Sequence, residues 1–423
     1  MRNITRSAVA DVNGADLSLL QLLNVEVLAD PWGLYRALRE HSPVHWDPYM
    51  HAWVVTGYSE VVTVLKDYSA DRTPTLEHLA QLGLSLLKPF AEMMQQQMLF
   101  MNGAMHARLR AICSAAFTPR RVEELLSEIE SVADGLIDKV ISTGRMDLIA
   151  DFANPFPGIV AAKLFGVPED DHHQIGIWTT DLAEVLGNFQ LHPDRVTHIV
   201  QSLKDFQSYV AARMEEQRRS PTAGLIHSLM TAQVDGHQLS DNEVIANTII
   251  TLIGGHETTT NLIGTGFFRL LREPESFWQL QSSPEIISSA VEELLRIESP
   301  IQYTVRIAPH TMQLGGQTIA EGSKVVAVLA AANRDPGRFP DPDRLNLSRS
   351  DNRHLAFGWA SHFCFGAPLA RMEGQVAFRK LLSRLSRPAL MDQTLNWRGN
   401  AGLRGLTSLN IRFDAVSPLA ASA

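Results

Sequence analysis

One cysteine of this chain lies just before a predicted helix, in the segment Phe-Gly-Trp-Ala-Ser-His-Phe-Cys-Phe-Gly at residues 357–366. A helix that begins near Pro368 would direct its unpaired amides and the positive end of its dipole at Cys364, and both lower the pKa of a thiol. Gly366 has no side chain and lets the backbone approach a flat, bulky cofactor. Cys364 is therefore a candidate thiolate ligand, with a buried free cysteine in a turn as the alternative for this residue taken alone.

A second candidate site lies at the centre of a helix predicted over Ser240–Leu271, where residues 254–260 read Gly-Gly-His-Glu-Thr-Thr-Thr. Glycines and β-branched threonines each weaken a helix by several tenths of a kcal/mol or more, so a purely structural helix would rarely contain them here. The glycines let a flat cofactor or dioxygen lie against the backbone, while Glu257 and Thr258 place an acid beside an alcohol. A zinc-protease helix of the form His-Glu-x-x-His is excluded, because residue 260 is a threonine.

Two further pairs of residues have helical spacing. His106 and Arg110 are four residues apart and share one helix face, where two cationic donors suit a ligand with two carboxylates. A solvated helix face is the alternative for this pair. Glu293 and Arg296 are three residues apart, a spacing that contributes only about 0.2–0.5 kcal/mol in an exposed pair.

Helical periodicity dominates the chain that must position these residues. Apolar residues at three- and four-residue intervals predict helices over Pro31–Glu40, Pro119–Ile141, Pro193–Arg218, Ser240–Leu271 and Glu285–Ile297. Shorter apolar segments predict strands at Ala52–Thr56, Val305–Ile307, Thr311–Leu314, Lys324–Leu329 and Leu409–Phe413. We therefore predict a mainly helical protein with small peripheral β-sheets.

The composition limits the classes of protein that the chain can represent. It has 423 residues, 45% of them hydrophobic, and 37 basic against 46 acidic side chains give a formal net charge of −9. These values are typical of a globular protein and exclude disordered and fibrous classes. The negative charge disfavours general nucleic-acid binding, and no segment has the length and apolarity of a signal peptide or membrane span. With only Cys113 and Cys364 available, we expect no disulfide framework and a cytoplasmic protein.

Residues 357–366 resemble the haem-binding signature of the cytochrome P450 family, Phe-x-x-Gly-x-His/Arg-x-Cys-x-Gly, except that Ala360 replaces the usual glycine. The resemblance implies that Cys364 is the proximal thiolate ligand of the haem iron. It also implies that His362 meets a haem propionate and that Phe357 packs beside the thiolate.

Other segments resemble the same family, from about Asp30 to Phe413. Gly255, Glu257 and Thr258 match the motif Ala/Gly-Gly-x-Asp/Glu-Thr, whose acid and alcohol deliver protons during oxygen activation. The matches to propionate-binding positions are His106, Arg110 and Arg306. Residues 101–105, Met-Asn-Gly-Ala-Met, depart from the family's usual Asp-Pro-Pro-Glu.

Glu293 and Arg296 match the family's Glu-x-x-Arg element. In the family this is a buried structural pair that supports the cysteine loop, together with a third residue from the later meander. Arg344 and Arg349 are both candidates for that third position. Removal of one member would leave an unpaired buried charge, at a cost of roughly 3–5 kcal/mol.

The resemblance implies a single domain over residues 1–423 with the cytochrome P450 fold and about 25 loosely ordered N-terminal residues. Haem b would lie between a long central helix and the helix after the cysteine loop. The implied activity is a haem-thiolate monooxygenase that inserts one atom of O2 into a hydrophobic small molecule by hydroxylation or epoxidation. A polyketide-like or other secondary metabolite is the expected substrate class.

Two alternatives to this activity remain. One is a catalytically silent partner protein with the same fold, and Cys364, Glu257 and Thr258 argue against it. The other is a peroxide-driven haem-thiolate peroxygenase, whose members usually lack the acid and alcohol pair. Haem content and a comparison of peroxide with electron donors would distinguish the three.

A methionine-rich stretch and several positions that match pocket residues of relatives indicate a large apolar substrate pocket. A core or helix seam is the alternative for the methionines, and His256 is either a pocket residue or an ordinary helix-face histidine. The expected pocket residues are Met93, Met94, Met98, Ala246, Ile250, Ile301, Gln302, Thr304 and Thr407.

Electrons are expected from a separate ferredoxin or flavodoxin and its reductase, because the chain leaves no room for a fused reductase. Two locally basic segments, 104–121 and 353–380, flank the cysteine side of the haem in the family, where an acidic donor would dock. The substrate could be free or carrier-bound, and no nucleic acid or membrane partner is expected. The expected docking residues are Arg108, Arg120, Arg121, Arg353 and Arg371.

Overall fold

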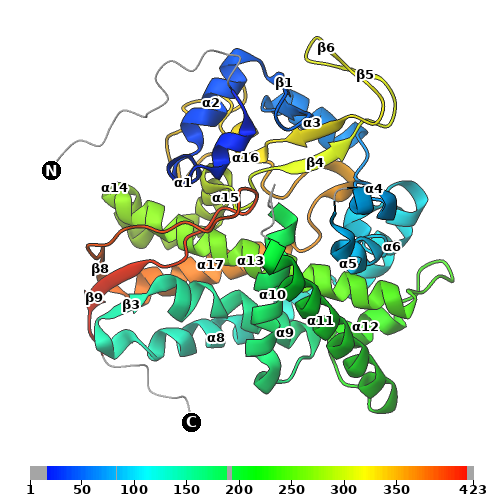
Figure 1. Cartoon of the computed structure of the whole chain (residues 1–423). Coiled ribbons are helices and arrows are strands. Elements are labelled where there is room, and N and C mark those ends of the chain that lie inside the picture. Colours follow the sequence, from blue (N-terminus) through cyan, green and yellow to red (C-terminus); the bar gives the residue numbers. More distant parts are fainter. Residues whose placement is uncertain (1–16, 82, 188–192, 417–423) are drawn as a thin grey trace.

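The computed structural model describes residues 17–81, 83–187 and 193–416, and helices make up most of it, as predicted (Figure 1). The α-helices are α1 Val25–Ala29, α2 Trp32–His41, α3 Tyr58–Asp67, α4 Leu76–Gln81, α5 Lys88–Met94, α6 Gly103–Ala116, α7 Pro119–Glu124, α8 Leu126–Asp138, α9 Pro155–Phe165, α10 His172–Gly187, α11 Pro193–Arg219, α12 Leu225–Thr231, α13 Asp241–Arg272, α14 Pro274–Ser282, α15 Ile287–Glu298, α16 Leu329–Ala332 and α17 Ala367–Arg384. The strands are β1 Val44–Asp47, β2 Ala52–Val55, β3 Arg145–Asp147, β4 Thr304–Ile307, β5 Met312–Leu314, β6 Gln317–Ile319, β7 Lys324–Ala327, β8 Ser386–Leu390 and β9 Asn410–Asp414.

The strands of the described residues form small sheets with the orders β1-β2-β7-β4, β3-β9-β8 and β5-β6. In the first sheet β7 is parallel to β2 and antiparallel to β4, and Arg306 lies opposite Val325. Arg306 is only 4% exposed, although its strand is short and lies at the edge of its sheet. The sheet therefore presents a buried guanidinium to the interior of the molecule.

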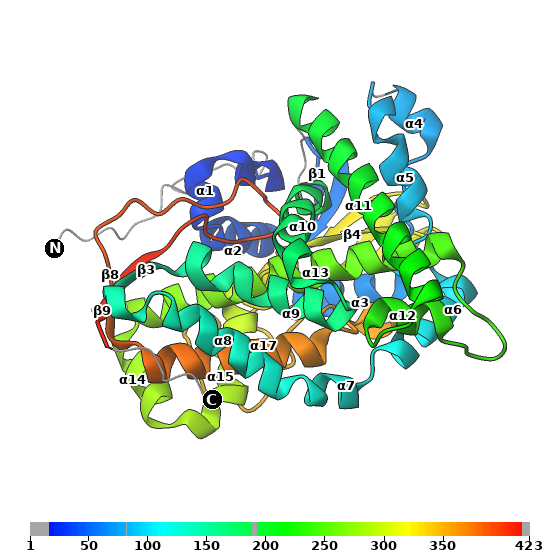
Figure 2. The same ribbon diagram turned by 90° about the horizontal axis from the view of Figure 1, so that it is seen from below.

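Helix α13 crosses the middle of the molecule in both views (Figure 1 and Figure 2). A capping box begins it, in which the Ser240 hydroxyl accepts from the Glu243 amide and the Glu243 carboxylate accepts from the Ser240 amide. Its 32 residues give a length of about 48 Å at 1.5 Å per residue. α9, α10, α11, α15 and α17 all pack against it, so α13 is the element around which the helical core is built.

The structure divides one predicted helix. The sequence predicted a single helix over Pro119–Ile141, but α7 ends at Glu124 and α8 begins at Leu126. The Leu125 amide bonds to the Val122 carbonyl, three residues back, and this tighter turn interrupts the helix. α8 then places Ile129 and its other apolar residues against α17 and α9.

Other boundaries differ by a few residues. The strand predicted over Lys324–Leu329 ends at Ala327, because α16 begins at Leu329. The strand predicted over Thr311–Leu314 begins one residue later, as β5. The helix predicted over Ser240–Leu271 is α13, with Ser240 as its cap.

None of the helices in the described part of the chain has the length and apolar composition that a membrane span requires. The single domain over 1–423 and the cytoplasmic location stay predictions. Of the first 25 residues, 1–16 lie outside the described residues, while Leu19 and Leu22 are buried in a short 3₁₀ turn, Leu19–Leu23.

Candidate functional site

Cys364 lies in the turn that leads into α17, beside the N-terminus of that helix. Its backbone amide donates to the Phe357 carbonyl at 2.8 Å, and its carbonyl accepts from the Ala367 amide at 3.3 Å. Burial raises the pKa of the Cys364 thiol, and the amides of Gly366 and Ala367 together with two arginines, Arg110 and Arg371, oppose that rise. The helix start thus acts in the expected direction, but in this structure burial is the larger effect.

The loop shows why the family usually has glycine where this chain has Ala360. Ala360 adopts φ 55°, in the left-handed region, and Gly358 two residues earlier has φ 72°. A residue with a β-carbon in this region costs roughly 1–2 kcal/mol relative to the right-handed conformation. Ala360 is solvent-exposed, so its methyl group displaces no core side chain, and the loop keeps its turn with local backbone strain.

Arginines and two imidazoles from separate elements meet beside the cysteine loop. The rings of His106 and His362 have centroids 4.1 Å apart. The pKa of His362 is lowered to about 3, mainly by burial and to a smaller extent by the electrostatic effects of His106, Arg306, Arg72 and Arg110. The pKa of Arg72 is lowered to about 9, mainly by burial and secondly by the positive charge of Arg306.

These basic side chains have few partners among the described residues. The buried Nε2 of His106 and Nε of Arg306 make no hydrogen bond to any described residue. Arg306 donates only to the Thr304 hydroxyl and the Val305 carbonyl. Among the described residues, no carboxylate is paired with Arg72, Arg110 or Arg306, so the cluster is electrostatically suited to an anionic group.

The structure brings the predicted propionate ligands His106, Arg110, Arg306 and His362 together and adds Arg72, which was not predicted from the sequence. Arg72 stacks over the Phe100 ring at 4.5 Å from its centroid and donates to the Ala70 carbonyl. It precedes α4 in an irregular segment, so no periodic pattern could have marked it.

The middle of α13 has an open face, although most of this helix is buried. Gly254 is exposed and Gly255 and Thr258 are half-buried, whereas their neighbours His256 and Glu257 are buried. A β-carbon added at Gly254 would meet no atom within 4 Å, and one at Gly255 would meet only the Ala161 methyl group at 4.0 Å. A flat group could therefore lie against this stretch of backbone.

The acid and the alcohol of this stretch point to different surroundings. The Thr258 hydroxyl donates to the Gly254 carbonyl at 2.6 Å on the open face. Glu257 Oε1 lies 2.6 Å from Arg398 Nη1 and also accepts from the Asn261 amide at 3.3 Å. Glu257 Oε2 is buried and has no partner among the described residues.

The contacts of His256 show whether it is a pocket residue or a core residue. Its Nδ1 lies 2.7 Å from the Thr179 hydroxyl and its Nε2 lies 2.9 Å from the Asn154 carbonyl. Burial lowers the pKa of the imidazole. A β-carbon at Gly158 would lie 3.3 Å from its Nε2, so the glycine makes room for the ring between α9, α10 and α13. His256 is therefore a satisfied core histidine.

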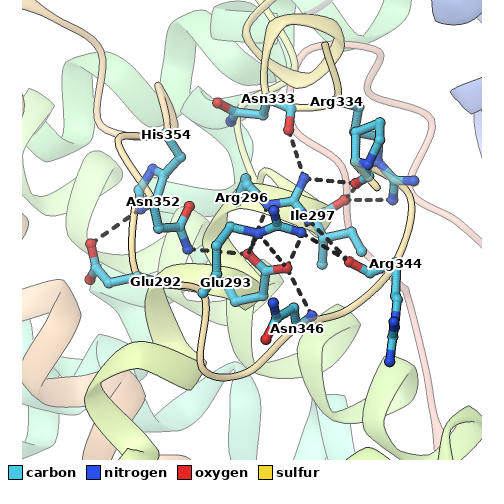
Figure 3. A network of polar contacts seen from close by, with 12 residues as sticks. Glu292, Glu293, Arg296, Ile297, Asn333, Arg334, Arg344, Asn346, Asn352 and His354 are labelled. Atoms are coloured by element: carbon cyan, nitrogen blue, oxygen red, sulfur yellow. Dashed lines mark hydrogen bonds and ion pairs between the residues drawn. The ribbon is translucent and has the colours of Figure 1, made fainter. Parts of the chain in front are cut away.

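Glu293 and Arg296 are the centre of a buried polar network (Figure 3). Arg296 Nε and Nη2 each lie 2.8 Å from one oxygen of the Glu293 carboxylate. Arg349 is the third member, with its Nε 3.0 Å from Glu293 Oε2, whereas Arg344 contributes only its backbone carbonyl. The Asn333 carbonyl accepts from Arg296 at 2.8 Å, which ties α15 to the segment that leads to the cysteine loop.

The expected pocket residues come from four parts of the chain. Met93 and Met98 are buried and Met94 is half-buried around α5, while Ala246 and Ile250 are buried on α13. The amide of Gln302 is used in the core, because it accepts from the Tyr35 hydroxyl and donates to the Ser299 carbonyl.

The remaining pocket positions flank β4 and a C-terminal loop. Ile301 forms an isolated β-bridge with Leu403, and Thr304 begins β4. Thr407 is exposed and donates to the Asn396 carbonyl at 3.1 Å. Their contribution to a pocket stays a prediction.

Comparison with known proteins gives a consistent result. The family model described as Cytochrome P450 matches residues 52–395. The chain is 34% identical to the polyketide biosynthesis cytochrome P450 PksS of Bacillus subtilis, over 91% of this chain and 96% of that protein. It is 33% identical to 6-deoxyerythronolide B hydroxylase of Saccharopolyspora erythraea, over 91% of this chain and 96% of that protein.

Solved structures agree with these relatives. The structure of P450BioI in complex with an acyl carrier protein that carries hexadec-9Z-enoic acid superposes with a TM-score of 0.87 and 34% identity. The match covers 92% of this chain and 99% of that one.

Proposed function

This chain belongs to the cytochrome P450 family, and from that premise we propose that Cys364 is the thiolate ligand of its haem. The protein is a haem-thiolate monooxygenase that uses haem b, O2 and electrons from an external donor to insert one oxygen atom into an organic substrate. When bound, the haem supplies the activation of dioxygen. The residues named below are the protein's own contribution to that chemistry.

The described residues fit this cofactor. The observation that carries the proposal is the cluster of His106, Arg110, Arg306 and His362 beside Cys364, in which two buried nitrogens, His106 Nε2 and Arg306 Nε, have no partner among the described residues. Haem carries two propionate groups, and these residues, with Arg72, would hold them. Gly255 and Phe357 are the other residues of the proposed haem site. Gly255 lies on the open face of α13, and the Phe357 carbonyl accepts a hydrogen bond from the Cys364 amide.

Glu257 and Thr258 are proposed to deliver protons during oxygen activation. Thr258 holds a hydroxyl proton at the open face of α13, where it is directed at the Gly254 carbonyl. Glu257 is the acid behind it, with its Oε2 free of any described partner. General acid–base catalysis by a positioned side chain typically contributes about 10²–10⁴-fold in rate.

The substrate is proposed to be a hydrophobic secondary metabolite of polyketide type. The buried methionines and the apolar α13 residues Ala246 and Ile250 support an adaptable apolar pocket. The name of PksS refers to polyketide biosynthesis, and P450BioI was solved with a fatty acid carried by an acyl carrier protein. A carrier-bound substrate is therefore included in the proposal.

A separate electron donor is proposed to dock on the cysteine side of the molecule. A surface groove of about 310 Å³ lies there between α7 and α17, with Arg371 and Arg379 in its lining. Four of the five expected docking cations are paired with an acid, so the free charge of this surface is lower than the sequence suggests. Arg108 pairs with Glu243, Arg120 with Glu124, Arg353 with Asp351 and Arg371 with Glu292, while Arg121 donates to the Ala116 carbonyl and the Ser228 hydroxyl.

Spectroscopy of the haem-loaded protein tests the ligand. Cys364→Ser should abolish the long-wavelength Soret band of the reduced carbonyl complex, because a serine hydroxyl is a far weaker donor to iron than a thiolate. Cys113→Ala is the matched control, since Cys113 is buried in α6 and burial raises its thiol pKa to about 12. Retention of the band in Cys364→Ser would refute the assignment.

A further inference from the structure

The carboxylate of Glu257 is held through only one of its two oxygens. Oε1 lies 2.6 Å from Arg398 Nη1 and 3.3 Å from Asn261 Nδ2, whereas Oε2 is buried without a partner among the described residues. The Glu257 side chain is 3% exposed and that of Arg398 is 20% exposed. The ion pair is therefore largely removed from water, and water competes weakly with it.

The backbone of a C-terminal loop fixes the position of Arg398. Trp397 pairs with Leu406 as an isolated bridge, and the Arg398 amide donates to the Gly405 carbonyl at 2.9 Å. This loop, 397–406, passes so close to α13 that a β-carbon at Gly405 would lie 1.8 Å from Asn261 Oδ1. The guanidinium is consequently supported from the loop side, while Glu257 is supported by α13.

The same loop contacts the segment that precedes β4. The backbone amide of Gln302 donates to the Gly402 carbonyl at 2.9 Å, and Leu403 forms an isolated β-bridge with Ile301. A displacement of this segment would be transmitted to the loop that carries Arg398. The anchor of Glu257 thus depends on contacts with residues proposed to line the pocket.

We propose that Arg398 is a positioning residue for proton delivery, which anchors Glu257 through Oε1 and leaves Oε2 as the oxygen that exchanges the proton. The inference rests on the proposed role of Glu257. Oε2 gives its proton toward the Thr258 side of α13 and regains one from solvent water, while Arg398 keeps its own protons throughout. His256 is another titratable group beside Glu257, and it is already bonded to Thr179 and to the Asn154 carbonyl.

Variants of the full-length, haem-loaded protein test this role. In Arg398→Gln, Glu257 loses its anchor, and we expect substrate turnover driven by an electron donor to fall roughly tenfold or more with a changed pH profile. The dissociation constant from the substrate-induced Soret shift should stay within about twofold of wild type. Arg398→Lys keeps the positive charge and should recover most of the turnover and the wild-type pH profile.

A readout independent of turnover is the coupling between the two residues in urea unfolding. Arg398→Gln and Glu257→Gln should each destabilise the chain, and the double variant should be less destabilised than the sum of the two. Arg384→Gln is the matched control, because Arg384 is a similarly buried arginine that pairs with Asp134 and Asp138 away from this loop. It should lower stability without a change in the pH profile.

The outcomes separate this proposal from the function it rests on. If Glu257→Gln loses turnover and Arg398→Gln keeps both wild-type turnover and pH profile, the positioning role is wrong and the role of Glu257 stands. If Glu257→Gln is fully active, both are wrong. A lysine variant as impaired as Arg398→Gln, or additive unfolding energies, would also overturn the positioning role.

Discussion

Glu257 and Thr258 are neighbours in the chain, but α13 turns their side chains to different surroundings. Successive residues of an α-helix point roughly 100° apart, so both cannot face one flat ligand equally. Thr258 is half-buried on the open face, and Glu257 is buried against Arg398. A proton that passes from the acid to the alcohol must therefore move from the buried side of the helix to its open side.

Glu373 is another buried acid, and the proposed mechanism does not use it. It lies on α17, 1% exposed, and its Oε1 accepts no hydrogen bond from any described residue. Burial raises its pKa from 4.5 to about 8, although the nearby Thr259 hydroxyl opposes the rise. The Thr259 hydroxyl makes no hydrogen bond of ordinary geometry to any described residue, so its opposing effect is weak.

This acid gives stability a defined pH dependence. Between pH 4.5 and about 8 the folded chain keeps the Glu373 proton that the unfolded chain releases, so this group's contribution to stability falls as pH rises. Glu373→Gln removes the dependence. The free energy of unfolding of the variant relative to wild type should therefore rise through this window, by up to roughly 1.4 kcal/mol per pH unit.

Urea unfolding of both proteins at several pH values within the window measures the difference. Thr259→Val leaves the acid in place and is the control for a change of packing between α13 and α17. A constant difference between Glu373→Gln and wild type across the window would show that Glu373 is ionised in the folded chain.

At the residue scale, sequence could predict groups whose spacing is local. Cys364 with its loop, the His106/Arg110 pair and the Glu293/Arg296 pair each lie within one short segment. Arg398 and Arg72 could not be predicted, because each reaches its partners from a distant, irregular segment. For the same reason the sequence could not decide whether Arg349 or Arg344 binds Glu293. Both precede the cysteine loop in one turn-rich stretch, and only the tertiary fold brings the Arg349 side chain to Glu293.

At the scale of elements, the glycines of α13 have two unrelated uses. Gly254 lies on the open face, and a β-carbon there would meet nothing within 4 Å. Gly266 lies in the packed part, and a β-carbon there would lie 2.7 Å from Phe378 Cζ of α17. The first glycine leaves space for a ligand, and the second allows two helices to approach closely.

Alanine substitution at these two positions should change stability in opposite directions. Gly254→Ala should raise the free energy of unfolding by about 0.5–1 kcal/mol, because alanine is the better helix former. Gly266→Ala should lower it by about 1–3 kcal/mol, because the fully buried Phe378 ring has to move. Chemical denaturation of the haem-free chains measures both, and shifts of equal sign would contradict this division of α13.

Several helices with strong periodicity were predicted, but α3, α9 and α10 were not, and boundaries set by tertiary contacts were not predicted either. α13 was predicted almost to its ends, because its apolar spacing and its Ser240 cap are both local signals. The break at Leu125 was missed, because the apolar spacing continues through it. The short strands β1, β3, β6 and β8 were missed because three to five residues are too few for an apolar and polar alternation to stand out from chance.

At the scale of the whole molecule, the net charge of −9 hides a pairing of charges that sequence cannot resolve. Counting residues along two segments suggested a strongly basic face. In the structure, Glu243, Glu124, Asp351 and Glu292 each pair with one of its arginines, and all four of these acids lie outside the segments that were counted. The electrostatic field of the proposed docking surface therefore depends on which of its arginines are exposed to solvent.

Arg120 and Arg353 are the most exposed of the paired docking candidates, with side chains 87% and 70% accessible, against 23% for Arg108. Exposed ion pairs are weak, so both guanidiniums remain free to attract an acidic donor. The second-order rate of reduction by a reduced ferredoxin should therefore fall with ionic strength, because the Debye length shrinks to about 10 Å near 0.1 M salt.

Charge reversal separates this surface from the rest of the molecule. Arg120→Glu and Arg353→Glu should each slow the low-salt reduction several-fold and flatten its salt dependence, since steering acts mainly on the encounter rate. Arg412→Glu is the control, because Arg412 is exposed on β9, in the sheet at the other end of the molecule (Figure 2). Stopped-flow reduction of the haem-loaded proteins measures all three. A rate that is indifferent to salt, or an equal effect of Arg412→Glu, would mean that overall charge rather than this face governs the encounter.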